Sequence, residues 1–230
     1  MINRKQVKEI SRQQLNRNGN WKIPILLALI TFFVTGNYPR GLNINDSFIM
    51  TISLGLVIST LNIFFVNSCL KIAKSEKVET IRWSDTLISL NTFIKCVLYS
   101  ILISLIEMSL TWIIIFIGSM YVITVPVLGA TLLVLSLVIG GIISIYCTFS
   151  IFLILDRKID VFKAIYISAK LIRGHFWEIL LLGLSFILWY IISIITLGVA
   201  MLWVLPYITV TFANYYLILY KKQYDKNHDF

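Results

Sequence analysis

The chain has 230 residues, of which 58% are hydrophobic, and it carries a formal net charge of +9. Soluble globular proteins are about half apolar, whereas this chain has repeated apolar runs of about 18 or more residues, the length of a transmembrane helix. The composition excludes an ordinary soluble protein and leaves no length for a separate soluble catalytic domain. The basic residues flank the apolar runs, so the charge indicates loops facing anionic lipid and not a nucleic-acid partner.

No motif of a known catalytic or metal site is present. The chain lacks HExxH, GxSxG, a Walker loop and GxGxxG, so we expect neither an enzyme nor a cofactor. Cys69, Cys96 and Cys147 form no CxxC pair and have no ligand-like spacing to a histidine. We therefore expect buried apolar thiols, with no metal site and no disulfide framework.

Residues 1–20 predict a short basic helix on the cytoplasmic membrane surface. On a helical projection Val7, Ile10 and Leu15 fall within an arc of roughly 140°, but Arg4 lies inside the same arc. Such a small apolar face predicts that charge, more than burial, holds the helix at the surface. Trp21 then begins the first apolar run, at the position of an interfacial anchor.

Six apolar runs predict an all-α fold, a polytopic membrane helix bundle of six transmembrane helices. We expect Pro206 to kink the last run, and an irregular patch with Pro126 and Gly129 to separate the third from the fourth. A turn at 196–198 joins the last two runs as a hairpin, and the charged connectors 74–91 and 156–175 predict further interfacial amphipathic helices. The expected spans are residues 21–35, 48–72, 92–118, 130–155, 176–195 and 199–220, in a transmembrane domain of residues 21–220 followed by a cytoplasmic tail of residues 221–230.

The distribution of basic residues predicts the topology. Eighteen of the 20 Lys and Arg residues lie before or at the start of the first run, in the connectors after the second and fourth runs, or in the tail. Arg40 lies on the opposite side, and we expect Lys95 to reach the cytoplasmic interface from the third run. The positive-inside rule then predicts a multi-pass protein of the bacterial cytoplasmic membrane with both termini in the cytoplasm. If residues 122–155 crossed twice, or residues 21–35 did not cross, basic segments would fall on both sides.

Small residues on two runs predict close contacts between helices. The second run has Gly55 and Ser59 four positions apart, a spacing that lets a neighbouring helix approach. The fourth run has a ridge of small residues at every fourth position, formed by Ser136, Gly140, Ser144 and Thr148.

Glu107, Asn62, Asn67 and Asn214 are the candidate polar site within the membrane. Glu107 lies deep in the third run, where a carboxylate is costly unless it is neutral, paired or facing water. One interpretation is a proton- or cation-linked site, and the other is a neutral carboxyl hydrogen-bonded to a neighbouring helix. The asparagines either join helices by hydrogen bonds or line a polar cavity.

The fifth run begins with a candidate interfacial motif. His175 and Glu178 are three residues apart and could hydrogen-bond on one helix face, whereas a metal would need further ligands that the sequence does not place. We expect a pair that helps to hold the helix end at the membrane surface, in a motif of Arg173, Gly174, His175, Trp177 and Glu178.

The C-terminal third resembles a known family. The residues that carry the resemblance are Asp156, Leu171, Arg173, Gly174, His175, Phe176, Trp177, Ser185, Phe186, Trp189, Gly198, Leu202, Trp203, Pro206, Tyr207, Tyr215 and Tyr216, with Gly19 and Trp21 near the start. Their order is similar to that of the bacterial, Firmicute-type integral membrane proteins grouped as domain-of-unknown-function family 975. The resemblance implies a multi-helix bundle in the plasma membrane, and it implies no activity and no catalytic residues. The chain departs from the family pattern after the third span, where Ile117 and Gly118 stand in place of a Pro-Gly turn.

Two functions from different classes fit these features. The first is a non-catalytic membrane module, of an accessory or immunity type, that binds a partner, a lipid or a peptide. Its expected partners are the anionic inner leaflet and a membrane protein or second copy of the chain. The alternative is a small permease-like transporter or exporter that uses Glu107, although no internal repeat of the kind common in transporters is evident.

The six-span topology predicts that the loops after the first and second runs lie on opposite sides of the membrane. A cysteine introduced at Asn43, as the only cysteine of the chain, should react with a membrane-impermeant maleimide from outside the cell. One introduced at Lys77 should react only after permeabilisation. Labelling of both positions from the same side would contradict the six-span topology.

Overall fold

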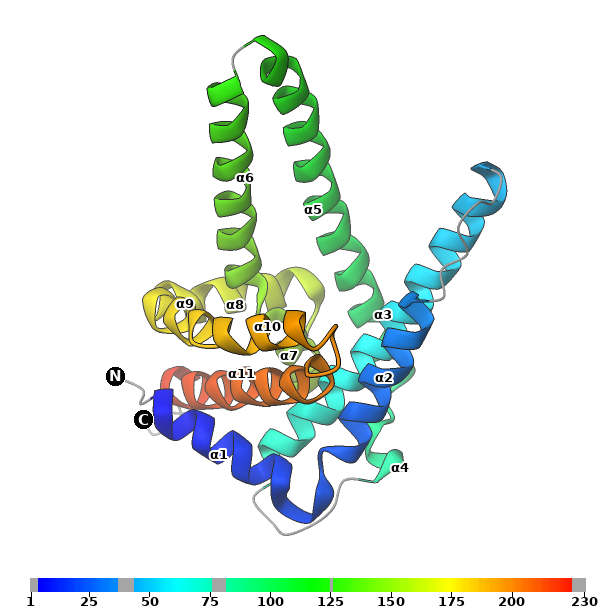
Figure 1. Ribbon diagram of the computed structural model, residues 1–230. Coiled ribbons are helices and arrows are strands. Elements are labelled where there is room, and N and C mark those ends of the chain that lie inside the picture. The colour runs from blue at the N-terminus through cyan, green and yellow to red at the C-terminus, as the bar shows by residue number, and fades with distance from the viewer. Residues whose placement is uncertain (1–3, 37–43, 76–81, 125, 225–230) are drawn as a thin grey trace.

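The computed structural model describes residues 4–36, 44–75, 82–124 and 126–224, and every regular element within these ranges is a helix (Figure 1). The all-α prediction is therefore confirmed. In chain order the elements are α1 (Arg4–Asn16), η1 (Arg17–Gly19), α2 (Lys22–Gly36), α3 (Ile44–Lys74), α4 (Trp83–Thr86), α5 (Leu90–Thr124), α6 (Pro126–Cys147), α7 (Ser150–Arg157), α8 (Val161–Arg173), α9 (Phe176–Leu184), α10 (Ile187–Ile195) and α11 (Met201–Tyr224).

Several helices are long and apolar enough to cross a membrane. Five such segments are found in the described ranges: Met50–Lys74, Leu90–Ile113, Val138–Arg157, Phe176–Ile195 and Met201–Tyr224. A sixth results if Arg4–Gly19 and Lys22–Gly36, which meet at a bend of 94°, are counted as one broken span. The chain is thus a multi-pass membrane protein.

Helix α11 lies at the centre of the bundle. It packs against α1, α2, α3 and α10, while α5 and α6 form a long hairpin that projects away from it (Figure 1). Buried rings join the start of α7 to α11: Phe149 stacks on Tyr215 with centroids 6.5 Å apart, and Phe152 stacks on Tyr216 at 5.8 Å. Aromatic pairs of this kind contribute about 0.5–1.5 kcal/mol beyond the area that they bury.

Helix α1 is held by the protein and not by charge alone, which corrects the sequence-based prediction. Val7, Ser11 and Leu15 are buried, and α1 packs on α11 and α3. Ile10, which was expected on the same apolar face, is 39% exposed. The buried stripe includes a serine because a polar partner on α11 meets it, and an apolar periodicity cannot reveal such a contact.

The apolar runs four and five are each divided into two helices. The breaks fall between α6 and α7 and between α9 and α10, and each leaves a phenylalanine buried, Phe149 at the first and Phe186 at the second. At the second break the Phe186 amide donates to the Gly183 carbonyl at 3.0 Å, a tightened turn. The bend allows the Ser185 carbonyl to accept a hydrogen bond from the Lys8 ammonium at 3.4 Å.

The prediction of an irregular segment around Pro126 and Gly129 is wrong. Helix α5 continues to Thr124, and α6 begins at Pro126 and runs through Gly129. Proline is well tolerated at the first position of a helix, because the amide that it lacks has no intrahelical acceptor there. Pro126 therefore starts a helix at this point and does not interrupt one.

The close helix contacts expected at the small residues do not form at Gly55 or at Gly140. A Cβ atom placed on either glycine would have no atom of the described residues, outside its own helix, within 4 Å. Gly55 of α3 and Gly140 of α6 thus have open space where a close helix contact was expected.

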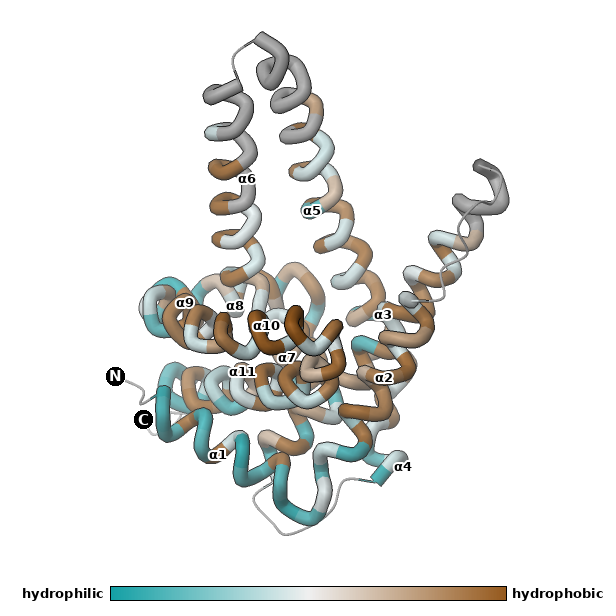
Figure 2. Tube along the Cα trace, in the orientation of Figure 1, coloured by the Kyte–Doolittle hydropathy of each residue, from teal (hydrophilic) through white to brown (hydrophobic). Residues whose placement is uncertain are grey.

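The surface of the bundle is apolar over most of its length. Hydrophilic residues concentrate along α1, around α4 and near the two termini, whereas hydrophobic residues dominate α2 and α10 (Figure 2). Large exposed apolar side chains include Ile194, Ile195, Trp203 and Leu197, the last of which is 88% exposed. Extensive exposed apolar surface of this kind marks contact with a membrane.

The turn between α10 and α11 has two residues in the left-handed region. The Gly198 amide donates to the Ser193 carbonyl at 2.7 Å and the Leu197 amide donates to the Ile194 carbonyl at 3.1 Å, the two bonds of a Schellman motif. The φ angle is 51° at Leu197 and 88° at Gly198. This backbone is strained for leucine and relaxed for glycine.

Substitutions in this turn should change stability in opposite directions. Gly198→Ala should lower the melting temperature in detergent by the equivalent of about 1 kcal/mol, because alanine disfavours positive φ. Leu197→Gly should raise it by a smaller amount, since relief of strain is partly offset by a more flexible unfolded chain. Gly174→Ala is the control, because Gly174 has φ −88° and open space around it. An equal loss in both alanine variants would show that the positive φ of Gly198 does not set the difference.

Candidate functional site

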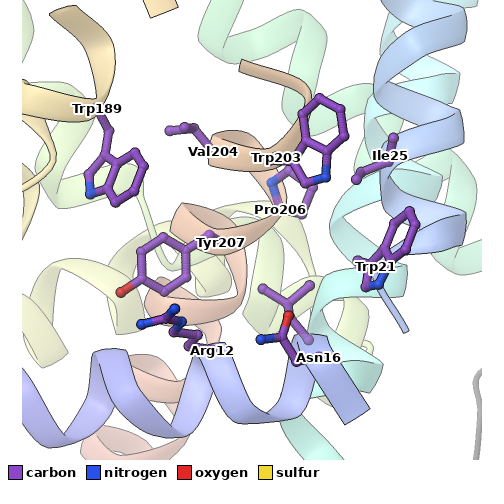
Figure 3. A pocket seen from close by; sticks show the side chains of 10 residues that line it. Arg12, Asn16, Trp21, Ile25, Trp189, Trp203, Val204, Pro206 and Tyr207 are labelled. Carbon is purple, nitrogen blue, oxygen red and sulfur yellow. The ribbon is translucent and has the colours of Figure 1, made fainter. Parts of the chain in front are cut away.

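A cavity of about 350 Å³ lies where α1, α2, α10 and α11 meet. Aromatic rings from three segments surround it: Trp21 precedes α2, Trp189 belongs to α10, and Trp203 and Tyr207 belong to α11 (Figure 3). We call this cavity the tryptophan pocket. Its complete lining is Arg12, Leu15, Asn16, Trp21, Ile25, Trp189, Trp203, Val204, Pro206 and Tyr207.

The rings hold one another and remain partly open to the surroundings. Trp189 and Tyr207 meet edge to face with centroids 6.4 Å apart, and Phe186 meets Tyr207 in the same way at 5.5 Å. Trp203 is nevertheless 56% exposed. Tryptophan favours the membrane–water interface because its ring is apolar and its N–H is polar. These rings therefore give the pocket an apolar wall.

The polar side of the pocket comes from α1. Arg12 and Asn16 lie beside the rings, with Arg12 close to Tyr207 (Figure 3). The Arg12 guanidinium makes no hydrogen bond or ion pair with any residue in the described ranges. The Arg12 guanidinium on this side of the pocket can therefore still donate hydrogen bonds to a ligand.

A network of side-chain amides fixes α1 in this position. The Asn214 side-chain amide on α11 donates to the Ser11 hydroxyl at 3.0 Å and to the Gln14 side-chain oxygen Oε1 at 2.7 Å. Gln14 in turn donates to the Ala73 carbonyl of α3 at 3.1 Å. Each of these groups would be costly to bury without a partner. The network therefore sets the rotation of α1 and with it the direction of Arg12.

Lys8 joins α1 to the break between α9 and α10. Its ammonium donates to the Ser185 carbonyl and lies 4.2 Å from the centre of the Phe186 ring. Partial burial, followed by the charge of Arg4, lowers the pKa of Lys8. Lys8 is thus committed to a structural contact, in contrast to Arg12.

A basic groove of about 890 Å³ adjoins the tryptophan pocket. Arg12, Asn16 and Tyr207 line both spaces, so the two are continuous. The groove contains four basic side chains and one acidic side chain, and its lining is Lys5, Lys8, Glu9, Arg12, Gln13, Asn16, Arg17 and Tyr207. An apolar pocket therefore opens onto a groove of net positive charge.

A buried carboxylate joins α3, α7 and α11 next to this region. Asp156 pairs with Lys74, accepts a hydrogen bond from the Tyr216 hydroxyl at 2.8 Å and lies 3.2 Å from the Arg157 guanidinium. Arg157 also stacks over the Tyr220 ring at 4.3 Å. The Asp156 side chain is only 4% exposed. We call this set the Asp156 cluster.

The family described as "Protein of unknown function (DUF975)" matches residues 1–223. The chain belongs to the DUF975 family. No curated protein and no solved structure is significantly similar to it.

Five of the residues by which the sequence resembles the DUF975 family meet in space. Trp21, Trp189, Trp203, Pro206 and Tyr207 all line the tryptophan pocket. The remaining tyrosines of the pattern, Tyr215 and Tyr216, lie in the core between α7, α9 and α11. Part of the pattern of this DUF975 protein therefore lines one pocket or packs behind it, whereas Arg173, Gly174 and Trp177 are exposed elsewhere.

Glu107 lies away from the tryptophan pocket. It is exposed on α5 and lines a separate cavity of about 130 Å³ with residues of α6, among them Ser144 and Cys147. Its carboxylate makes no hydrogen bond or ion pair within the described ranges. Lys95, on the same helix, pairs with Asp160 at 2.6 Å in the connector after α7.

The three candidate asparagines lie in different places. Asn62 lines an apolar cavity of about 330 Å³ between α2, α3 and α11. Asn67 is buried and donates to the Thr86 carbonyl of α4 at 2.9 Å, while Asn214 binds α1. The structure therefore does not bring these residues and Glu107 together into one polar site.

The interfacial motif is also divided. Glu178 accepts a hydrogen bond from the Tyr215 hydroxyl at 2.6 Å, whereas Arg173, Gly174 and Trp177 are exposed. His175 precedes α9 as its N-cap residue. Among the described residues, no three His, Cys, Asp or Glu side chains are placed to share a metal ion. Glu178 is thus half-buried and bonded to α11, whereas Arg173, Gly174 and Trp177 face outward.

Sequence reasoning missed the tryptophan pocket as a site. Trp21 was interpreted as an anchor and Pro206 as the site of a kink. Pro206 lies inside α11, which runs from Met201 to Tyr224. Nothing in the sequence around Arg12 and Asn16 indicated that they line a binding site. The available signal was the tryptophans of the family pattern, but nothing in their spacing along the chain shows that they share a cavity.

The burial of the Asp156 cluster predicts that loss of the Asp156–Lys74 pair lowers stability more than loss of the exposed Asp160–Lys95 pair. Asp156→Asn should lower stability by about 2 kcal/mol, because it weakens charge-assisted hydrogen bonds in a buried site. Asp160→Asn is the matched control, since Asp160 also pairs with a lysine but its side chain is 80% exposed. It should leave the melting temperature nearly unchanged. Thermal unfolding of both variants in the same detergent tests this, and equal losses would contradict it.

Proposed function

We propose that this DUF975 protein is a non-catalytic membrane module that binds an amphiphilic molecule in the tryptophan pocket. The observation that carries the proposal is the continuity of an aromatic-walled cavity with a basic groove. A volume of about 350 Å³ falls within the range of roughly 300–1,000 Å³ in which proteins hold small ligands. The wall suits an apolar chain, and the groove suits a polar head.

A module of this kind needs no reacting groups. The polar side chains of the pocket are Arg12, Asn16, Tyr207 and the indole N–H groups, none of which forms a nucleophile–base pair with another. Such a site can hold, present or sequester an amphiphile. An accessory or immunity role, in which a lipid or membrane-active peptide is retained, follows from this capacity.

The expected setting is a bacterial cytoplasmic membrane, with α1 and both termini on the cytoplasmic side. The sequence's excess of Lys and Arg in the predicted cytoplasmic segments supports this orientation. The groove would then face the inner leaflet at headgroup depth.

Transport through Glu107 is a second candidate function. One observation favours it: an unpaired carboxylate in the described part of α5 faces a cavity shared with α6. A carboxyl at that depth can carry a proton or a cation. Flux into liposomes, compared between the wild type and Glu107→Gln, distinguishes this candidate from binding alone.

Filling the tryptophan pocket should abolish binding. Phospholipids with a photoreactive diazirine in one acyl chain, in bilayer nanodiscs, should label the pocket residues saturably in the wild type. Ile25→Trp should reduce this labelling at least tenfold, because the added ring occupies the cavity. Mass spectrometry of the labelled peptides provides the measurement, for both phosphatidylglycerol and phosphatidylcholine probes.

The control is Ile101→Trp, which adds the same ring to an exposed position on α5. It should leave labelling of the pocket unchanged. If neither probe labels the wild-type pocket saturably, or if Ile25→Trp retains full labelling with both, the proposed function is wrong.

A further inference from the structure

We propose that the ligand of the tryptophan pocket is an anionic phospholipid whose phosphate binds Arg12 while one acyl chain lies among the tryptophans. This inference rests on the proposed function and specifies its ligand class. It depends on the position of Arg12 at the boundary of two spaces, one apolar and one basic. A phospholipid is divided in the same way into an apolar part, its acyl chains, and a polar headgroup, and its phosphate lies where the two meet.

Arg12 is available to such a phosphate. Its guanidinium has no hydrogen bond or ion pair in the described ranges, and Glu9, the acidic side chain in the groove lining, forms none with it. Arginine binds phosphate oxygens through two parallel N–H groups, a geometry that lysine cannot reproduce. Arg12 therefore offers both the charge and the donors that this group requires.

The neighbouring groups hold Arg12 in place. Two side chains of α1 on either side of it, Ser11 and Gln14, accept hydrogen bonds from Asn214. Lys8, one turn earlier, is fixed on the Ser185 carbonyl and the Phe186 ring. The helix that carries Arg12 is thus attached to α11 and to the α9–α10 break before any ligand binds, and this reduces the entropic cost of binding.

The charge of the groove selects against a zwitterionic headgroup. Aromatic walls attract a quaternary ammonium through cation–π contacts, so a choline headgroup is the main competitor for the site. The groove, however, has Lys5, Lys8, Arg12 and Arg17 against the single carboxylate of Glu9. A choline beside these cations is repelled, whereas a glycerol headgroup leaves the phosphate charge uncompensated and attractive.

The acyl chain has a matching path. Ile25, Val204 and the Trp203 ring form the pocket wall opposite α1, and Trp203 is open to the surroundings. A chain from the adjacent leaflet can enter beside Trp203 without leaving the bilayer. The inferred ligand is therefore a lipid drawn from the membrane and not a soluble phosphate compound.

Comparing two headgroups tests this inference. In nanodiscs, the wild-type pocket should be labelled about tenfold more by the photoreactive phosphatidylglycerol than by the phosphatidylcholine with the same chains. Arg12→Gln should reduce the ratio to near one. Lys163→Gln, which removes an exposed cation of α8, is the matched control and should keep the wild-type ratio.

The source of the phosphate is tested by competition. Excess inorganic phosphate should leave the labelling unchanged, because the acyl chain contributes to binding, whereas excess unlabelled phosphatidylglycerol should remove it. Arg12→Lys should restore less than half of the preference, because lysine lacks the bidentate fork. Melting temperatures of the variants, measured without added lipid, separate a loss of binding from a loss of folding.

Each result distinguishes the two proposals. Equal labelling of the wild type by both lipids, removed by Ile25→Trp, would overturn the inference while the proposed function stands. Preference for phosphatidylcholine would overturn it in favour of a choline site. A preference that persists in a folded Arg12→Gln variant would show that Arg12 is not the phosphate ligand.

Discussion

One buried amide, that of Asn214, determines where the first helix lies. Within a membrane the apolar surfaces of helices gain little by leaving lipid for one another, so hydrogen bonds and shape decide which helices associate. Asn214 donates to two side chains of α1, and Gln14 extends the same network to α3. A predominantly polar, basic helix is thereby held against the centre of the bundle. The tryptophan pocket exists because α1 forms one of its walls.

Further buried polar contacts lie next to this network in sequence and in space. Asp156 and its partners join α3, α7 and α11, and Glu178 joins α9 to α11 through Tyr215. Farther along α5 and α6 the two helices diverge from the bundle, and the described surface there is apolar (Figures 1 and 2). In the protein, α3, α7, α9 and α11 are thus joined by hydrogen bonds and ion pairs at one end of the bundle, which we call the base. The α5–α6 hairpin extends away from this base. A ligand site with fixed geometry is expected in the base, which is where the tryptophan pocket lies.

Breaks in two apolar runs shape this base. If residues 176–195 formed one straight helix, Phe186 and Trp189 would follow a single regular spiral. The bend at Ser185 and Phe186 instead buries Phe186, exposes a carbonyl to Lys8 and sets Trp189 against Tyr207. The local loss of helical hydrogen bonding is offset by these contacts. The break thus adds one contact to α1, through Lys8, and one aromatic pair to the tryptophan pocket.

The fold class, the apolar runs and the family resemblance could all be predicted from the sequence, because they follow from composition and from the order of residues along the chain. Charge patterning also predicted a topology, since lipid and water impose it on each segment separately. Only the folded chain brings Arg12, Trp21, Trp189 and Trp203 into one pocket, buries Ser11, and keeps Glu107 apart from the asparagines. These contacts join positions up to two hundred residues apart, and their geometry depends on helix breaks that an unbroken apolar run conceals. The sequence of a membrane protein shows which segments are apolar, but it does not show how each helix is rotated about its axis. That rotation decides which side chains meet.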